Sequence, residues 1–146
     1  MRLLCIDHGL KRIGLAICDP SGMIARELRV IERKSKAEDF ALINQIASEH
    51  GAEAVVVGLP HNPEAKDGEH TQADTVRLWT DRFAETTTLP IVFWDEQLTS
   101  EDARELSIRQ KRKPRDPIDD LAARVILQSY LNAMRDGLAE PPPNVN

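Results

Sequence analysis

The chain has 146 residues, of which 41% are hydrophobic and 29% are charged, and its formal net charge is −5 at pH 7. This length suits one domain with room for a hydrophobic core, and this composition excludes an intrinsically disordered chain. No apolar stretch approaches the length that spans a membrane, and the N-terminus, with a single Arg2, has no secretory pattern. We therefore expect a soluble, cytoplasmic protein with no membrane partner.

The two cysteines, Cys5 and Cys18, fall in segments that are expected to form strands. We interpret both as small buried apolar residues, which fits a reducing compartment. A disulfide between them across a hairpin is the less favoured alternative.

The hydrophobic pattern predicts the elements in chain order. Strands are expected at residues 2–6, 13–19, 24–31, 52–57 and 89–94. Helices are expected at residues 37–50, 71–84, 99–108 and 117–134, and Asp116 is the expected N-cap of the last one. A meander of three strands is thus followed by alternating helices and strands. This order predicts one α/β domain whose sheet is antiparallel at first and parallel afterwards.

Acidic residues follow the first and the last expected strands. Asp7 comes directly after the first apolar run, and Asp95 and Glu96 come after the last one. A further acidic group stands at the start of the final helix: Asp116, Asp119 and Asp120. Ligands of open α/β sheets bind at the carboxyl ends of strands. A carboxylate in that place typically holds a metal ion or a metal-bound phosphate.

Four motifs occur in order along almost the whole chain. They are Asp7-x-Gly9-x-Lys11-Arg12-Ile13-Gly14, Val57-Gly58-Leu59-Pro60, Asp95-Glu96-Gln97-Leu98-Thr99-Ser100 and Ile118-Asp119-Asp120-Leu121-Ala122-Ala123. With these residues the chain resembles the YqgF family, bacterial proteins described as pre-16S rRNA nucleases or Holliday-junction-resolvase-like proteins. The resemblance implies a ribonuclease H-like α/β fold, with a mixed five-stranded sheet flanked by helices. We expect a nuclease domain over residues 1–138 and, from the proline run at 141–143, a flexible tail over 139–146.

The resemblance places the catalytic and metal-binding acids of the family at Asp7, Glu96 and Asp119. Phosphodiester hydrolysis needs an activated water and a stabilised leaving oxygen, and two Mg²⁺ or Mn²⁺ ions roughly 3.5–4 Å apart supply both. Three carboxylates from distant segments suit such hard ions. We expect Asp7 to bridge the ions, because it follows the first and central strand.

Each acid also has a plainer interpretation. Asp7 could cap the turn at Gly9. Asp95 is a rival to Glu96, and strand alternation allows only one of the two to point at Asp7. For Asp119, a position in the first helical turn is compatible with both helix stabilisation and metal binding.

Basic residues cluster despite the negative net charge. We expect nucleic acid to bind at two places: Lys11 and Arg12 beside the first acid, and Arg109, Lys111, Arg112 and Lys113 before the final helix. We interpret a third cluster as solvated surface: Arg26, Arg29, Arg33, Lys34 and Lys36. The expected partners are pre-rRNA, more than branched DNA, and ribosomal precursor particles. Of the neighbouring aromatic residues, we interpret His8 as a turn histidine and Trp79 and Trp94 as core residues.

One residue departs from the family pattern. An arginine usually follows Asp-Glu, whereas this chain has Gln97, which cannot make a bidentate phosphate contact. Arg124 or the basic segment 109–115 could replace that arginine. Besides a nuclease acting on RNA or on Holliday junctions, two functions stay open. One is a non-catalytic nucleic-acid-binding module, and the other is an actin-like ATPase, which would need a second domain.

Overall fold

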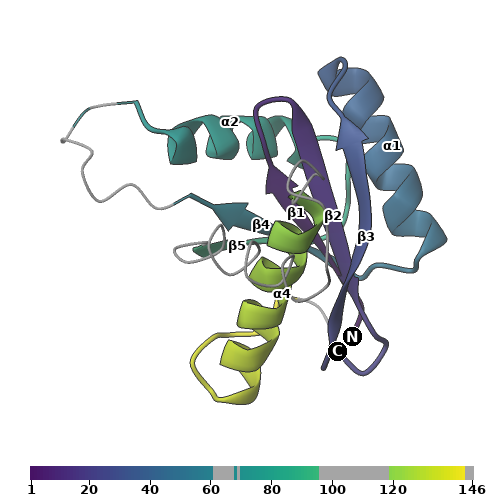
Figure 1. The fold of residues 1–146 in the computed structure, drawn as a ribbon, viewed down its shortest axis with the longest axis vertical. Helices are drawn as coiled ribbons and strands as arrows, with labels where there is room; N and C mark the ends of the chain where they lie inside the picture. The colour runs from purple at the N-terminus through teal and green to yellow at the C-terminus, as the bar shows by residue number, and fades with distance from the viewer. Residues whose placement is uncertain (61–67, 69, 96–118, 144–146) are drawn as a thin grey trace, which may run out of the picture.

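The computed structural model describes residues 1–60, 68, 70–95 and 119–143. One sheet with the strand order β3-β2-β1-β4-β5 organises the molecule (Figure 1). Its strands are β1 (Leu3–His8), β2 (Arg12–Cys18), β3 (Ala25–Glu32), β4 (Ala54–Leu59) and β5 (Ile91–Asp95). The pairs β1–β2 and β2–β3 are antiparallel, whereas β1–β4 and β4–β5 are parallel. The predicted mixed α/β sheet, with the first strand at its centre, is confirmed.

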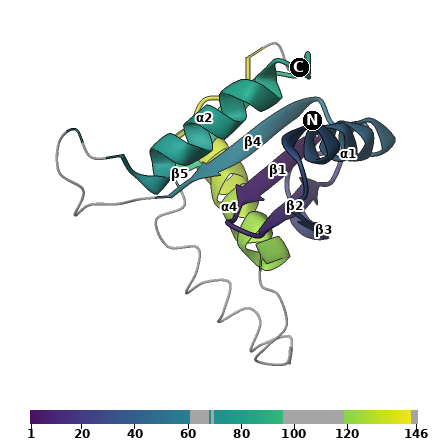
Figure 2. The same ribbon diagram turned by 90° about the horizontal axis from the view of Figure 1, so that it is seen from above.

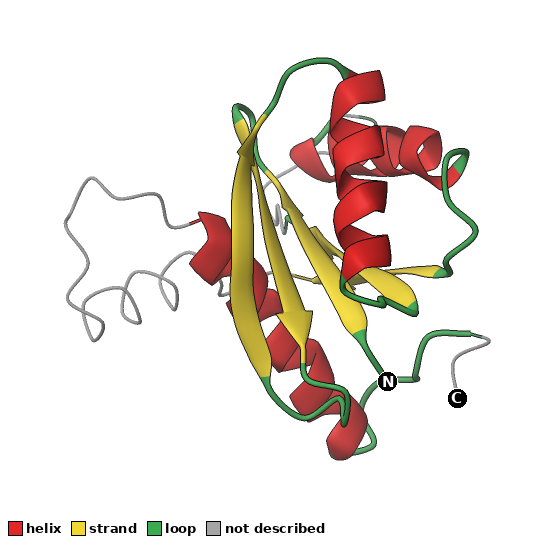
Figure 3. Ribbon diagram, turned by 90° about the vertical axis from the view of Figure 1, so that its right-hand side faces the viewer, coloured by secondary structure: helices red, strands yellow, loops and turns green. Residues whose placement is uncertain are grey.

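Helices cover both faces of this sheet. Helices α1 (Lys36–Glu49) and α2 (Gln72–Ala84) lie on one face, and α4 (Asp119–Arg135) lies on the other (Figures 2 and 3). The Ser35 hydroxyl caps α1 by accepting from the Glu38 N–H, and Thr71 forms a capping box with Asp74 at the start of α2. No helix in the described part of the chain is both long and apolar enough to cross a bilayer.

Strand alternation divides the hydrophobic core into two halves, one on each face of the sheet. Leu4 and Ile6 of β1 pack with the residues of α1 and α2, whereas Leu3 and Cys5 pack with those of α4. All four side chains are fully buried. Strand β1 is therefore apolar on both faces, as expected for a central strand.

The two cysteines are buried and free, as predicted. The Cys18 thiol accepts from the Leu3 N–H at 3.2 Å and donates to the Met1 carbonyl oxygen at 3.3 Å. Burial raises the pKa of Cys18, so this thiol is a packed group rather than a nucleophile.

Several boundaries differ from the sequence prediction. Strand β1 runs two residues further than expected, because Asp7 pairs with Gly14 and His8 pairs with Ile13. Asp7 therefore lies inside the strand and not in the turn. Strand β4 begins two residues later than expected, since the Ala52 N–H still bonds to Ala47 at the end of α1. The expected helix at 99–108, the basic segment 109–115 and the expected N-cap Asp116 lie outside the described residues.

The chain beyond α4 begins with defined contacts. The Tyr130 hydroxyl donates to the Glu140 carbonyl oxygen at 2.7 Å, and Ala139 packs against the α4 side of the core. The division into a domain ending at residue 138 and a tail stays a prediction.

A tight hairpin joins β1 to β2. The Gly9 N–H donates to the Arg12 carbonyl oxygen at 2.9 Å, and a Cβ at Gly9 would lie only 2.6 Å from that oxygen. Arg33 holds the hairpin from outside, because its Nη1 donates to the carbonyl oxygens of Gly9 and Leu10, both at 3.0 Å. The turn thus needs glycine for a close backbone approach.

His8 is a core residue of β1, so its interpretation as a turn histidine was wrong. It is 7% exposed, and its ring lies 4.8 Å from that of Trp79, which is itself buried as predicted. Burial first, and then the positive charge of Arg33, lower the pKa of His8 to about 4. The ring is therefore neutral at pH 7.

The change Gly9→Ala is expected to lower the free energy of unfolding by about 1–3 kcal/mol, because the added methyl group meets a backbone oxygen that cannot move aside. The midpoint of urea unfolding measures this loss of stability. The control is Leu10→Ala in the same hairpin, whose side chain is 82% exposed and whose truncation is expected to be nearly neutral. Equal midpoints for the two variants would contradict the close approach at Gly9.

The lowered pKa of His8 predicts that the stability of the protein depends on pH. Between pH 6.5 and about 4 the unfolded chain binds a proton at this ring and the folded chain does not. Stability contributed by His8 is therefore present above pH 6.5 and is lost on acidification, by at most about 1.4 kcal/mol per pH unit. We expect His8→Phe to flatten this part of the profile when urea midpoints are measured in EDTA. Parallel profiles for the two proteins would contradict a neutral buried His8.

Candidate functional site

Asp7 lies near the carboxyl end of β1, on the α4 face of the sheet. Cys5, two residues earlier, packs in the α4 half of the core, and alternation gives Asp7 the same direction. Unlike the fully buried residues before it, Asp7 is half-buried. The strand therefore places one carboxylate at its carboxyl end, where the buried core meets the rim of the sheet.

Glycines flank Asp7 on both neighbouring strands. Gly14 of β2 is its register partner, and Gly58 of β4 follows Val57, the partner of Ile6. Both glycines are buried, and neither places a side chain beside the carboxylate. Glycine inside a strand often marks the close approach of a ligand. This signal was visible in the sequence motifs, and the sequence reasoning did not use it.

The start of α4 lies at the same end of the sheet. The Gln128 side chain accepts from the Ala25 N–H, at the beginning of β3, and Arg124, one turn earlier, pairs with Glu27 further along β3. The helix therefore runs opposite to β3, and its first residue, Asp119, is at the carboxyl end of β1 (Figure 1). Only the backbone of Asp119 is described.

Asp95 lies on the other face from Asp7. Its register partner, Leu59, packs with the α1 and α2 half of the core, whereas Trp94 packs with the α4 half. This placement argues against Asp95 as a partner of Asp7. Glu96, the preferred ligand of the sequence analysis, lies outside the described residues.

A metal site can be tested here only through Asp7. Among the described side chains, no group of three histidine, cysteine or acidic residues comes close enough to hold a metal ion. Asp7 alone of the three predicted ligands has a described side chain. Its half-buried carboxylate, bordered by glycines, fits the oxygen donors that Mg²⁺ and Mn²⁺ take.

The predicted cations lie in different settings. Lys11 and Arg12 are exposed on the β1–β2 hairpin, where Arg12 pairs with Glu32 at 3.3 Å. Arg124, the suggested replacement for the family arginine, pairs with Glu27 at 2.9 Å and so links α4 to β3. The predicted binding segment with Arg109, Lys111, Arg112 and Lys113 lies outside the described residues.

Trp94 has a structural role. Its indole N–H donates to the Ser129 hydroxyl at 3.1 Å, and its ring lies 5.3 Å from that of Tyr130. Both partners belong to α4, so Trp94 joins β5 to that helix, in agreement with its interpretation as a core residue.

Solved structures share this fold at low sequence identity. The RuvC protein of Thermus thermophilus, solved in complex with a Holliday junction substrate, has a TM-score of 0.63 and 18% identity, over 97% of this chain and 99% of that one. The fowlpox virus resolvase, solved with Holliday junction DNA, has a TM-score of 0.57 and 11% identity, over 92% and 99%. These neighbours confirm the ribonuclease H-like fold.

Relatives of known sequence match more closely. Two bacterial proteins, both named "Putative pre-16S rRNA nuclease", are 38% identical (Desulforudis audaxviator; 94% of this chain, 98% of the relative) and 40% identical (Caldanaerobacter subterraneus; 93% and 99%). The model of the RuvX family, described as Holliday junction resolvase, matches residues 1–133. This match over almost the whole chain shows that the protein belongs to the RuvX family of nucleases, also called YqgF, as its four motifs indicated.

Proposed function

We propose that this protein is a metal-dependent endonuclease that cleaves phosphodiester bonds in structured nucleic acid and processes the 5′ end of pre-16S rRNA. The observation that carries this proposal is the placement of Asp7. Its carboxylate stands at the rim of the central strand, between Gly14 and Gly58 and at the end of the sheet where α4 begins. The positions directly beside Asp7 on the two neighbouring strands therefore carry no side chain that a scissile phosphate would meet.

Asp7, Glu96 and Asp119 would hold the divalent ions, Mg²⁺ or Mn²⁺. When bound, such ions activate the attacking water and stabilise the leaving oxygen. Pairing of Asp7 with Gly14 of β2, and of the preceding Ile6 with Val57 of β4, holds the backbone at Asp7 in place, which limits the reorganisation needed on binding. Three carboxylates brought together in one pocket would repel one another, and bound cations would relieve this repulsion.

The names of the curated relatives support pre-16S rRNA as substrate, and a protein with this task works in the cytoplasm. A second candidate function, resolution of Holliday junctions, is favoured by the description of the matching family model. RNA and DNA present the same phosphodiester, and a protein distinguishes them at the 2′-hydroxyl group.

One experiment separates the two substrates. End-labelled RNA spanning the 5′ end of 16S rRNA and a labelled four-way DNA junction are incubated with the full chain and Mg²⁺ or Mn²⁺. Cleavage of the RNA at a defined position supports the proposal, and cleavage of the junction alone supports the second candidate. A protein that binds either substrate but cleaves neither with both metals would be a non-catalytic module.

Replacing Asp7 by asparagine should reduce cleavage by at least about 100-fold, because removal of a metal-binding charge takes away several kcal/mol of transition-state stabilisation. The change keeps the side-chain volume, so circular dichroism and the unfolding midpoint should stay close to those of the wild type. Asp95→Asn is the matched control, since Asp95 is exposed on the opposite face of the sheet. Equal reductions in both variants, or full activity of Asp7→Asn, would contradict the site.

Neutralising Lys111, Arg112 and Lys113 to glutamine should weaken RNA binding and flatten its dependence on salt. Removing one lysine–phosphate or arginine–phosphate interaction lowers the slope of log K against log[salt] by about 0.7 to 0.9. Fluorescence anisotropy in EDTA measures the slope without cleavage. An unchanged slope would show that this segment does not contact phosphate groups.

A further inference from the structure

The structure brings two basic segments together that are about twenty residues apart in the sequence. The Arg33 N–H donates to the Lys11 carbonyl oxygen at 3.0 Å, and the Arg33 guanidinium bonds to the carbonyl oxygen of Gly9. The loop between β3 and α1 is thereby fastened to the β1–β2 hairpin. We call the cations that this contact gathers the hairpin–α1 surface: Lys11, Arg12, Lys34 and Lys36.

Three lysines of this surface are exposed. The ion pairs found in the described part of the chain do not include Lys11, Lys34 or Lys36. Arg12, by contrast, pairs with Glu32, and Arg33 is engaged by the hairpin. The three ammonium groups thus remain available to an anionic partner.

The carboxylates nearby are already engaged. Asp39 is buried and accepts from the Lys34 backbone N–H at 3.1 Å, and Glu38 accepts from the Ser35 hydroxyl at 3.2 Å. Glu32 is the partner of Arg12. These acidic groups stabilise the start of α1 and the hairpin but keep their charge. The local excess of positive charge is therefore two, from five cations (Lys11, Arg12, Arg33, Lys34 and Lys36) and three carboxylates (Glu32, Glu38 and Asp39), on a chain whose net charge is −5.

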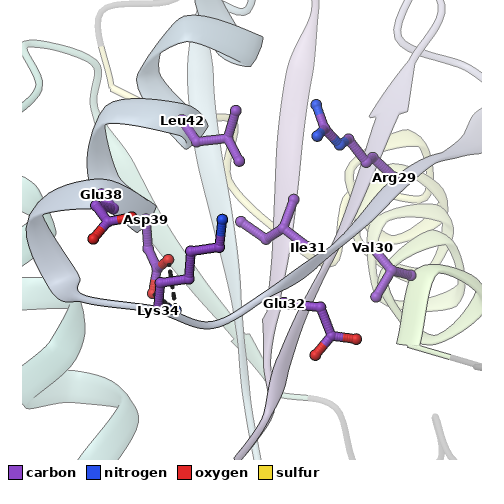
Figure 4. Close-up of a pocket in the computed structure, with 8 residues that line it drawn as sticks. All are labelled: Arg29, Val30, Ile31, Glu32, Lys34, Glu38, Asp39 and Leu42. Carbon is purple, nitrogen blue, oxygen red and sulfur yellow. Dashed lines mark hydrogen bonds between the residues drawn. The ribbon is translucent and has the colours of Figure 1, made fainter.

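Figure 4 shows where one of these lysines points. The Lys34 ammonium extends away from the Asp39 carboxylate, past Ile31 and toward Leu42. It lines a pocket of about 360 Å³ between β3 and α1, to which Arg29 contributes a second cation. Glu32, Glu38 and Asp39 line the same pocket, so its two cations stand beside three carboxylates, and the phosphate contact is expected at the exposed ammonium groups outside the pocket.

This surface is close to Asp7. In the sheet, Asp7 pairs with Gly14, and Gly14 pairs with Val30 of β3. Neighbouring strands are about 4.8 Å apart, so β3 is about 10 Å from β1. The hairpin with Lys11 joins β1 to the intervening strand β2, at the end of the sheet where β3 also ends. Asp7 points to the α4 face and α1 covers the other face, so a strand of nucleic acid cleaved at Asp7 reaches Lys34 and Lys36 by passing over the hairpin end of the sheet.

We propose that Lys11, Lys34 and Lys36 bind the phosphate backbone of the substrate beside the scissile bond, so that the nucleic acid crosses the β1–β2 hairpin toward the start of α1. The position of the scissile bond rests on the proposed function. Lysines bind phosphate groups as point charges, without reading the base sequence. Arg33 is a positioning residue, since it joins the two segments and is itself engaged.

The test compares two variants that each lack two positive charges. Lys34→Gln combined with Lys36→Gln changes the surface, whereas Arg82→Gln combined with Arg135→Gln changes the last turns of α2 and α4, at the opposite end of the sheet. The probe is a labelled RNA hairpin, and its affinity is measured in EDTA at several salt concentrations.

We expect the lysine variant to lower the salt slope by about 1.4 to 1.8, as for the removal of two lysine–phosphate interactions, and the arginine variant to leave it nearly unchanged. Lys34→Arg combined with Lys36→Arg should restore the slope. Equal slopes for the lysine and arginine variants would overturn the proposal. Unfolding midpoints of all variants confirm that they are folded.

Cleavage is measured separately, so that the two proposals can fail independently. If the wild type cleaves RNA and the lysine variant binds with an unchanged slope, the surface is wrong and the proposed function stands. If the slope falls as expected but the wild type cleaves nothing, the surface stands and the nuclease proposal fails. In an active enzyme the lysine change should raise KM and leave kcat nearly unchanged, because these residues lie outside the reacting centre.

Discussion

The pairing of β1 on both edges and its burial on both faces determine the geometry of the rest of the molecule. Its neighbours β2 and β4 run in opposite senses, and together they fix the register of every residue from Leu3 to His8. Because side chains alternate, a slip of one residue would exchange Asp7 and His8 between the faces. The fully buried residues of this strand make such a slip costly, so the direction of the Asp7 carboxylate follows from the packing of the core.

The carboxyl end of β1 carries both the contacts that stabilise the hairpin and residues that are proposed to bind nucleic acid. Gly9 allows the hairpin to close tightly, and Arg33 fastens that hairpin to the loop before α1. These contacts involve backbone oxygens of the hairpin, which would be in place whether or not the neighbouring side chains are basic. The exposed lysines on both segments are therefore not needed for the fold. Under the proposal above, their charge serves to bind the phosphate backbone of the substrate.

Sequence reasoning succeeded where the signal was local. The order of strands and helices followed from hydrophobic periodicity, and the glycine at position 51 ends α1 with a φ of +65°. Sequence reasoning failed for His8, because a polar Asp-His-Gly run resembles a turn. The structure keeps this histidine in the strand, since Ile13 pairs with it and Trp79 covers its ring. Burial against a distant helix outweighed the local preference.

By itself, then, the sequence determined the family and the order of the elements, because motifs and periodicity are properties of neighbouring residues. Only the tertiary structure decided that Asp95 faces away from Asp7, that Gly14 and Gly58 flank Asp7, and that Lys34 lies beside the hairpin. Each of these facts depends on register between strands or on contacts between distant segments. Such contacts form only when the whole sheet assembles, and no short stretch of sequence encodes them.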